Sequence, residues 1–189
     1  MTPRETHLVE LVDASGVPRG AATVEDAHRQ PGDLHRAFSV VLVDPAGRLL
    51  LQRRAKVKTR FAGRWANACC GHPTPGVAVT DAATVRLREE LGLDRVALRE
   101  IGVHAYRAVD PDRPDRVEHE YDHVLLGWLP ADATFSPDPT EVDAVRWVDL
   151  PELRRQLALA PDTYAPWLTG VIALLPDSVA ARPGGLSEL

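Results

Sequence analysis

The sequence has little of what secreted and membrane-spanning proteins depend on. Its 189 residues include two cysteines, and because these are adjacent, a disulfide framework is implausible and a reduced, cytoplasmic setting fits better. No apolar run approaches the roughly 20 residues that cross a bilayer, and residues 1–6 lack the apolar segment of a signal peptide. The net charge of −5 argues against general nucleic-acid binding. We therefore expect a cytoplasmic monomer without membrane or nucleic-acid partners.

Lysine is also scarce, and its placement is informative. Lys56 and Lys58 are the two lysines of the chain, and both lie in the cationic run 53–60, directly after a predicted strand. A local cationic patch on an acidic protein indicates a small anion such as a phosphate or diphosphate. The alternative, a solvated basic loop, is weakened because the run precedes the cysteine- and histidine-containing segment 69–74.

The composition that remains predicts one domain of mixed α and β structure, over residues 1–179, followed by a flexible tail at 180–189 that has no periodicity. The content of 44% hydrophobic and 26% charged residues is average for a globular protein. Thr80 is a candidate N-cap and Gly92 a candidate terminator of the clearest helix. The predicted strands are 8–12, 38–43, 48–52 (a hairpin with 38–43), 101–109, 117–129 and 145–148, and the predicted helices are a short one capped at Thr23, then 80–91, 150–159 and 164–175.

Cys70 and His72 stand two residues apart at the end of an apolar stretch. Side chains alternate across a strand, so both point to the same face, which can put a proton-transfer group beside a metal ligand. A buried thiol next to a surface turn histidine is the alternative, since free cysteine is often only a small hydrophobe. Cys69 faces the other way, and we expect it to pack in the core.

Histidines and carboxylates elsewhere can complete a metal site. His28 and His35, both in the N-terminal segment 1–36, flank a Pro-Gly breaker pair, so the chain can turn both rings toward one point. Glu118 and Glu120 lie on the same face of a predicted strand, where they repel unless a cation or a shared proton lies between them. With His72, this set suits Zn²⁺, Mn²⁺, Fe²⁺ or Mg²⁺ without naming the metal.

The predicted helix 80–91 supplies a second acidic feature. Arg86 and Glu90 are four residues apart and share a face, while Glu89 is expected to point away from them. These residues could be ordinary surface charge before a glycine stop. The functional interpretation places Glu90 near a divalent cation that bridges its carboxylate to phosphate oxygens.

Together these residues resemble a Nudix box, G-x5-E-x7-R-E-U-x-E-E-x-G-U with U apolar. Val77, Val85 and Arg86 stand where the hydrolases carry Glu, Arg and Glu, which puts pyrophosphohydrolase activity in doubt. The resemblance implies a Nudix fold of the α/β (α+β) class, with mixed β-sheets sandwiched between α-helices. The positions that fit the box are Gly71, Leu87, Glu89, Glu90, Gly92 and Leu93.

The departures from the box are shared with the type I isopentenyl-diphosphate isomerases, a Nudix-fold branch that the chain resembles from Leu11 to about Trp167. The segments that stand in the expected order and spacing are His28-x6-His35, Ala37-Phe38-Ser39, Arg53-Arg54-Ala55, Asn67, Cys70-Gly71-His72-Pro73, Tyr106-Arg107-Ala108, Glu118-His119-Glu120 and Pro166-Trp167. This combination is more specific than the box alone.

The resemblance implies reversible isomerisation of isopentenyl diphosphate to dimethylallyl diphosphate, a 1,3-allylic proton shift used in isoprenoid synthesis. By motif position, Cys70 and Glu120 are the acid/base pair and Tyr106 hydrogen-bonds Glu120. Trp167 matches a tryptophan suited to cation–π contact with the carbocation. A tightly bound Mn²⁺, Mg²⁺ or Zn²⁺ would be held by His28, His35, His72, Glu118 and Glu120. Glu90 would bind Mg²⁺ that arrives with the diphosphate, and the phosphate ligands would be Arg54, Lys58 and Arg86.

Two other functions stay open at this point. A Nudix hydrolase acting on a nucleoside or prenyl diphosphate would release phosphate or pyrophosphate, and the altered box argues against it. A non-catalytic diphosphate-binding module would keep Arg54 and Lys58 but would not need Cys70 or Glu120.

Overall fold

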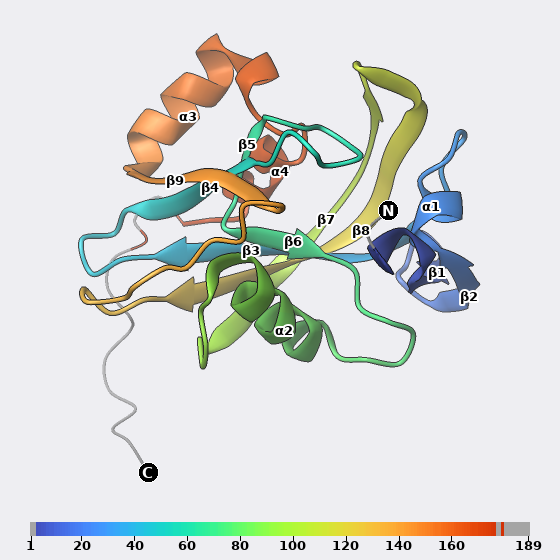
Figure 1. The fold of residues 1–189 in the computed structure, drawn as a ribbon, viewed down its shortest axis with the longest axis horizontal. Coiled ribbons are helices and arrows are strands. Elements are labelled where there is room, and N and C mark those ends of the chain that lie inside the picture. Colours follow the sequence, from blue (N-terminus) through green and yellow to red (C-terminus); the bar gives the residue numbers. More distant parts are fainter. Residues whose placement is uncertain (1–2, 177–178, 180–189) are drawn as a thin grey trace.

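A mixed β-sheet with helices on both of its faces organises the computed structural model, which describes residues 3–176 and 179 (Figure 1). The predicted tail 180–189 lies outside the described residues. Their elements are η1 (Pro3–Thr6), β1 (Leu8–Val12), β2 (Pro18–Thr23), α1 (Val24–Ala27), β3 (His35–Val43), β4 (Leu49–Arg54), β5 (Trp65–Ala66), β6 (Cys69–Gly71), α2 (Val79–Leu91), β7 (Leu98–Asp110), β8 (Arg113–Trp128), β9 (Val142–Val148), α3 (Leu150–Leu159), η2 (Pro161–Thr163) and α4 (Leu168–Ala173).

Strand β3 is the centre of this sheet. It pairs in parallel with β8 over nine residues, from His35 beside Glu120 to Val43 beside Trp128, and antiparallel with β6. The predicted hairpin between 38–43 and 48–52 is confirmed at its turn, where β3 and β4 pair antiparallel, but among the described residues this pairing is limited to Val43 beside Leu49. β4 instead pairs with β9 over most of its length. A turn signal fixes where the chain reverses, but not which strand becomes the neighbour.

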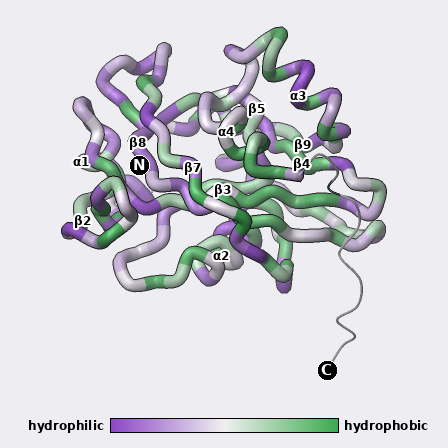
Figure 2. Tube along the Cα trace, turned by 180° about the vertical axis from the view of Figure 1, so that it is seen from behind, coloured by the Kyte–Doolittle hydropathy of each residue, from purple (hydrophilic) through white to green (hydrophobic). Residues whose placement is uncertain are grey.

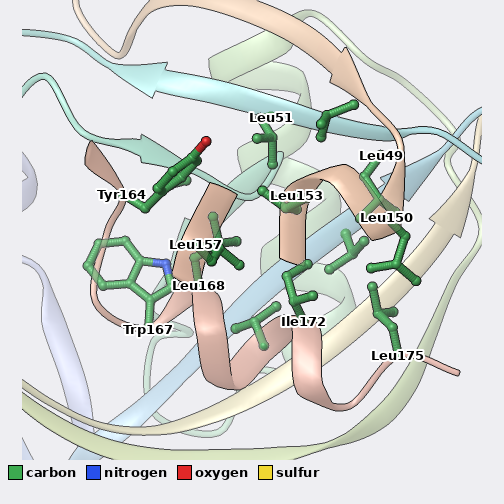
Figure 3. Packing of buried hydrophobic residues seen from close by; sticks show 14 of the residues in the cluster. Leu49, Leu51, Leu150, Leu153, Leu157, Tyr164, Trp167, Leu168, Ile172 and Leu175 are labelled. Atoms are coloured by element: carbon green, nitrogen blue, oxygen red, sulfur yellow. The ribbon is translucent and has the colours of Figure 1, made fainter. Parts of the chain in front are cut away.

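The apolar residues of β3 alternate between two hydrophobic cores, one on each face of the sheet. Val41 and Val43 pack in the cluster that α3 and α4 cover, whose closely packed leucines Figure 3 shows. Phe38, Val40 and Leu42 pack in the cluster beneath α2. A strand buried on both faces must be apolar at nearly every position, and the trace of β3 is hydrophobic over much of its length in Figure 2. This burial fixes the strand register, since a slip of one residue would exchange the two sets.

Helix α2 begins earlier than predicted. Ala78 is its N-cap and makes no side-chain capping bond, so the prediction of Thr80 as the cap is wrong. The extended backbone at Ala78 starts the helix at Val79 and places Thr80 inside the first turn. The predicted terminator is confirmed, because Gly92 is the C-cap in the left-handed conformation with φ of 68°.

Strands β7 and β8 are longer than predicted, since they pair with each other from Leu98 beside Gly127 to Asp110 beside Arg113 and form a hairpin that extends past the sheet (Figure 1). Helix α4 is shorter than the predicted 164–175. Among the described residues, no helix is both long and apolar enough to cross a membrane.

Leu153 and Leu159 give a matched test of the α3 core. Leu153 is fully buried, whereas Leu159 is 71% exposed at the end of the same helix. We expect Leu153→Ala to lower the free energy of unfolding by about 2–5 kcal/mol, and Leu159→Ala to change it by about 0.5 kcal/mol or less. Urea denaturation followed by circular dichroism measures both, and similar losses in the two variants would contradict this packing.

Candidate functional site

Strand register brings the polar residues of the site to one face of the sheet. His35 lies beside Glu120 in the parallel β3–β8 pair, and Ser39 lies opposite Cys70 in the antiparallel β3–β6 pair. Side chains of paired residues share a face, and on this face the same strands continue into the core that α3 and α4 cover. Cys69 points to the other face and is fully buried in the α2 core, as predicted.

Three imidazole rings meet at the end of this face. The ring centroids of His28, His35 and His72 are 4.5–5.0 Å apart. Nδ1 of His28 lies 2.7 Å from the carbonyl oxygen of Val24, and Nδ1 of His35 lies 2.8 Å from that of Asp33. Because a carbonyl only accepts, each Nδ1 carries a proton, and each Nε2 points into the cluster.

Two carboxyl groups face these nitrogens. Nε2 of His28 lies 2.9 Å from Oε2 of Glu118, and Nε2 of His72 lies 2.8 Å from Oε1 of Glu120. Burial, followed by the neighbouring Glu118 charge, raises the pKa of Glu120 to about 8. Burial and the neighbouring imidazoles lower the pKa of His35 and of His72 well below the usual value. The lowered pKa values of His35 and His72 favour neutral imidazoles, the form in which histidine binds metals.

The cluster fits a divalent metal ion. Ligand atoms of His28, His35, His72 and Glu120 all lie within 4.8 Å of one another. Nε2 of His35 is buried and has no hydrogen-bond partner among the described residues, a costly arrangement unless something else binds that lone pair. Glu118 lies beside this group of four, since its carboxylate bonds His28 and accepts from Arg60 at 3.3 Å. Glu90 lies elsewhere, on α2.

Glu120 also connects the histidine cluster to two aromatic residues, Tyr106 and Trp167. The Tyr106 hydroxyl donates to its Oε2 at 2.7 Å. Burial, and the charge of Glu120, raise the pKa of Tyr106 well above its usual value. The Tyr106 ring lies 6.1 Å from the ring of Trp167, which is 3% exposed at the edge of the buried cluster in Figure 3.

Cys70 reaches the same aromatic residues through Asn67. Burial raises the pKa of its thiol to about 12, and the nearby carboxyl of Asp122 contributes. Its Sγ lies 3.3 Å from Oδ1 of Asn67, and that oxygen accepts from Nε1 of Trp167 at 3.0 Å. Cys70 and Glu120 are therefore joined by a continuous path of contacts through Asn67, Trp167 and Tyr106.

The cationic residues of the predicted phosphate site already contact other groups of the protein. Arg54 donates to the carbonyl oxygens of Arg60 and Phe61, and its guanidinium lies 5.3 Å from the centroid of the Trp167 ring. Lys58 forms an ion pair with Glu141. Each of these cations has a partner, so a bound anion would compete with contacts already present.

Arg86 contacts three carboxylates. It pairs with Glu90, with Glu89 at 2.7 Å and with Glu141 at 3.3 Å. The expectation that Glu89 points away is therefore wrong, because residues three apart on a helix can also meet. Glu90 additionally accepts from Nε2 of Gln52 at 3.1 Å.

Several residues of the site have no counterpart in the sequence-based prediction. Asp122 is fully buried and continues the alternation of Glu118 and Glu120, so the period of two could have identified it. Glu141 joins Lys58 and Arg86 from a loop far along the chain, and no local pattern indicates this. The N-terminal turn also takes part, by pairs of Arg4 with Glu89 and Glu141 and of Glu5 with Arg60.

Comparisons with known proteins agree with this architecture. The NUDIX domain family matches residues 33–169. An isopentenyl-diphosphate Delta-isomerase from Nocardia farcinica is 57% identical over 166 residues, which cover 88% of this chain and 93% of the relative. One from Streptomyces coelicolor is 44% identical over 179 residues, covering 95% and 85%.

Among solved structures, a protein from Deinococcus radiodurans superposes with a TM-score of 0.69 at 18% identity, over 90% of this chain and all of that one. At that identity the superposition establishes the fold alone. The identity to the named isomerases, over most of both lengths, establishes more. The chain belongs to the NUDIX domain family and, within it, to the isopentenyl-diphosphate Delta-isomerases.

Proposed function

We propose that this protein isomerises isopentenyl diphosphate reversibly to dimethylallyl diphosphate. One observation carries the proposal: a buried thiol and a buried carboxyl group, Cys70 and Glu120, lie on the same face of the sheet and are joined through Asn67, Trp167 and Tyr106. An allylic shift needs two such proton carriers. It requires no activated water, which hydrolysis would.

Cys70 and Glu120 are the acid/base pair of the proposed reaction. A proton is added to the terminal methylene carbon, which leaves a tertiary carbocation at the neighbouring carbon. A proton then leaves the methylene group that lies between the cationic carbon and the carbon bearing the diphosphate. Burial raises the pKa of both groups, which makes the thiolate and the carboxylate stronger bases once deprotonated. Tyr106 holds Glu120 through its hydroxyl.

Trp167 would stabilise the carbocation through its ring face. Its burial keeps water, which would trap the cation, away from that face. Arg54 lies over the same ring, and its positive charge would compete with the carbocation for that ring face. A bound diphosphate neutralises Arg54, so substrate binding itself would favour the interaction between the ring and the reacting carbons.

The ligands of the resident metal, which we assign as Mn²⁺, Mg²⁺ or Zn²⁺, are His28, His35, His72, Glu118 and Glu120. When bound, this ion would fix the orientation of Glu120 and tune its acidity. Glu90 would hold the Mg²⁺ that accompanies the diphosphate. Glu118 is kept in place by Arg60, whose Nε lies 3.3 Å from its Oε1.

Arg54, Lys58 and Arg86 would bind the phosphate oxygens. The proximity of Arg86 to Glu90 supports this assignment, since a Mg²⁺–diphosphate unit presents both charges. A hydrolase would use carboxylates of the box to hold further cations, and Arg86 occupies one of those places as a cation. A non-catalytic diphosphate-binding module would leave the Cys70–Glu120 arrangement without a role.

We assign the whole segment 1–179 to one isomerase domain. The pairs that Arg4 and Glu5 make with residues of the site support including the N-terminal segment. We further assign the protein to the cytoplasm, a compartment in which free thiols such as Cys70 stay reduced. We assign it as a monomer.

Replacing the two adjacent cysteines tests the proposed reaction. With isopentenyl diphosphate and Mg²⁺, the protein should form an acid-labile allylic product without releasing phosphate. We expect Cys70→Ala to abolish turnover by removing one proton carrier, while Cys69→Ala, in the α2 core, retains most of it. Phosphate release would contradict isomerisation, and the reverse ranking of the two variants would contradict the assignment of Cys70.

Removing the metal tests the histidine cluster. Dialysis against a chelator should stop isomerisation, and readdition of Mn²⁺, Mg²⁺ or Zn²⁺ should restore it. His35→Ala deletes a lone pair that has no other partner, so we expect at least about tenfold weaker binding of the metal in a chelator-competition titration. Unchanged metal affinity in His35→Ala, or full activity of metal-free protein, would contradict the ligand set.

Lys58 and Lys56 give a matched test of the phosphate site. Lys58→Ala removes a charge-assisted contact and leaves Glu141 near the phosphates, so we expect KM for isopentenyl diphosphate to rise about tenfold or more. Lys56 is exposed and two residues away, and Lys56→Ala should change KM little. Steady-state kinetics at constant ionic strength measure both, and equal effects would indicate general attraction instead of direct binding.

A further inference from the structure

Asn67 is a buried side chain whose amide is bonded on both sides. It is 1% exposed and lies between β5 and β6. Its Nδ2 donates to the carbonyl oxygen of Val40 at 3.1 Å and to that of Cys69 at 2.8 Å. Its Oδ1 accepts from Nε1 of Trp167 at 3.0 Å and lies 3.3 Å from Sγ of Cys70.

These partners fix which way the amide faces. The two carbonyl oxygens only accept, and the indole N–H of Trp167 only donates. Turning the Asn67 amide over would set Oδ1 against two carbonyls and its NH₂ group against another donor. Asn67 therefore presents an acceptor to Cys70, and the thiol S–H is the donor in that contact.

Ser39 defines the other side of the thiol. Its Oγ lies 3.6 Å from Sγ of Cys70 and donates to Oδ2 of Asp122 at 2.7 Å. A hydroxyl has one proton, so while it donates to Asp122 it offers lone pairs to the thiol. Cys70 is thus held between two acceptors, Ser39 on β3 and Asn67 in the segment between β5 and β6, and of these two Asn67 also accepts from the Trp167 indole.

We infer that Asn67 is a positioning residue for the isomerisation, which fixes the Cys70 thiol and the Trp167 indole relative to each other. This inference rests on the proposed function, in which the thiol and the ring act on the same few carbon atoms. Val40 and Cys69 anchor Asn67 to β3 and β6, and Trp167 joins it from 100 residues later in the chain. A displacement of about 1 Å at such a site can cost about 100-fold in rate.

The test compares Asn67→Ala with Leu42→Ala, both in a Cys69→Ala parent so that alkylation reports on Cys70. Leu42 is fully buried near the end of β3 farthest from His35, and Leu42→Ala controls for lost stability. We expect Asn67→Ala to lower kcat by about 100-fold while KM for isopentenyl diphosphate stays within about threefold, because the phosphate ligands are untouched. Leu42→Ala should retain kcat below its melting temperature.

Alkylation of Cys70 by iodoacetamide gives a second, independent measurement. Asn67→Ala frees the thiol from its acceptor, and the reaction should become faster. Trp167→Phe keeps a ring but deletes the indole N–H, so Oδ1 serves the thiol alone and the reaction should become slower. The slower alkylation expected for Trp167→Phe can be measured even where Asn67→Ala does not fold.

Three results would overturn the positioning role of Asn67: unchanged kcat in Asn67→Ala, equal losses of kcat in Asn67→Ala and Leu42→Ala, or unchanged alkylation in Trp167→Phe. The two kcat results require activity in the parent, the alkylation result does not, and all three leave the proposed function standing. Absence of isomerase activity in the unaltered protein would overturn the proposed function and the positioning role together, so the two failures are distinguishable.

Discussion

The parallel pairing of β3 with β8 sets the position of almost every residue of the site. It places His35 beside Glu120 and runs on without interruption into the valines and leucines of the α3/α4 core. Those apolar positions supply the free energy that holds the register, because a slip by one residue would exchange the side chains that pack in the two cores. The polar end of the same face, from His35 to Ser39, is thereby positioned by packing that takes no part in the chemistry. Cys70 enters this face by pairing opposite Ser39.

Charge balance is the second constraint. Burying carboxylates without partners is costly, and the buried carboxylates of the site have partners of two kinds. Glu118 and Glu120 face imidazole nitrogens, an arrangement that a divalent cation stabilises. Glu90 and Glu141 instead share Arg86. Glu141 pairs with Lys58 and Arg86, two of the cations that we assign to the phosphates. Under that assignment a diphosphate would have to displace Glu141, and this competition would favour multiply charged ligands over single phosphates.

The sequence was most informative where function depends on local periodicity. Alternation predicted that Glu118 and Glu120 share a face and that Cys69 and Cys70 do not, and helical spacing predicted the contact between Arg86 and Glu90. It failed where the answer depends on which distant segments meet. The hairpin expected from the turn at 44–47 is shorter than predicted, since β4 pairs along its length with β9 and β3 pairs with β8. Likewise, no sequence pattern predicts the contact between Asn67 and Trp167. Both residues belong to the segments that carry the family resemblance, but the resemblance did not indicate that they meet.

Arg86 is one of three departures from the hydrolase box, and its charge has a consequence for the site. It already contacts Glu89, Glu90 and Glu141. A carboxylate at this position would bring a fourth negative charge into the same small volume, which could be relieved only by additional cations. Additional cations lower the pKa of bound water and generate nucleophiles, and a nucleophile next to a carbocation would trap it. With arginine here, the three carboxylates pair with cations of the protein itself, which are Arg86, Arg4 and Lys58. In the isomerisation that we propose, the reacting carbons would then lie beside the buried ring of Trp167, away from such a nucleophile.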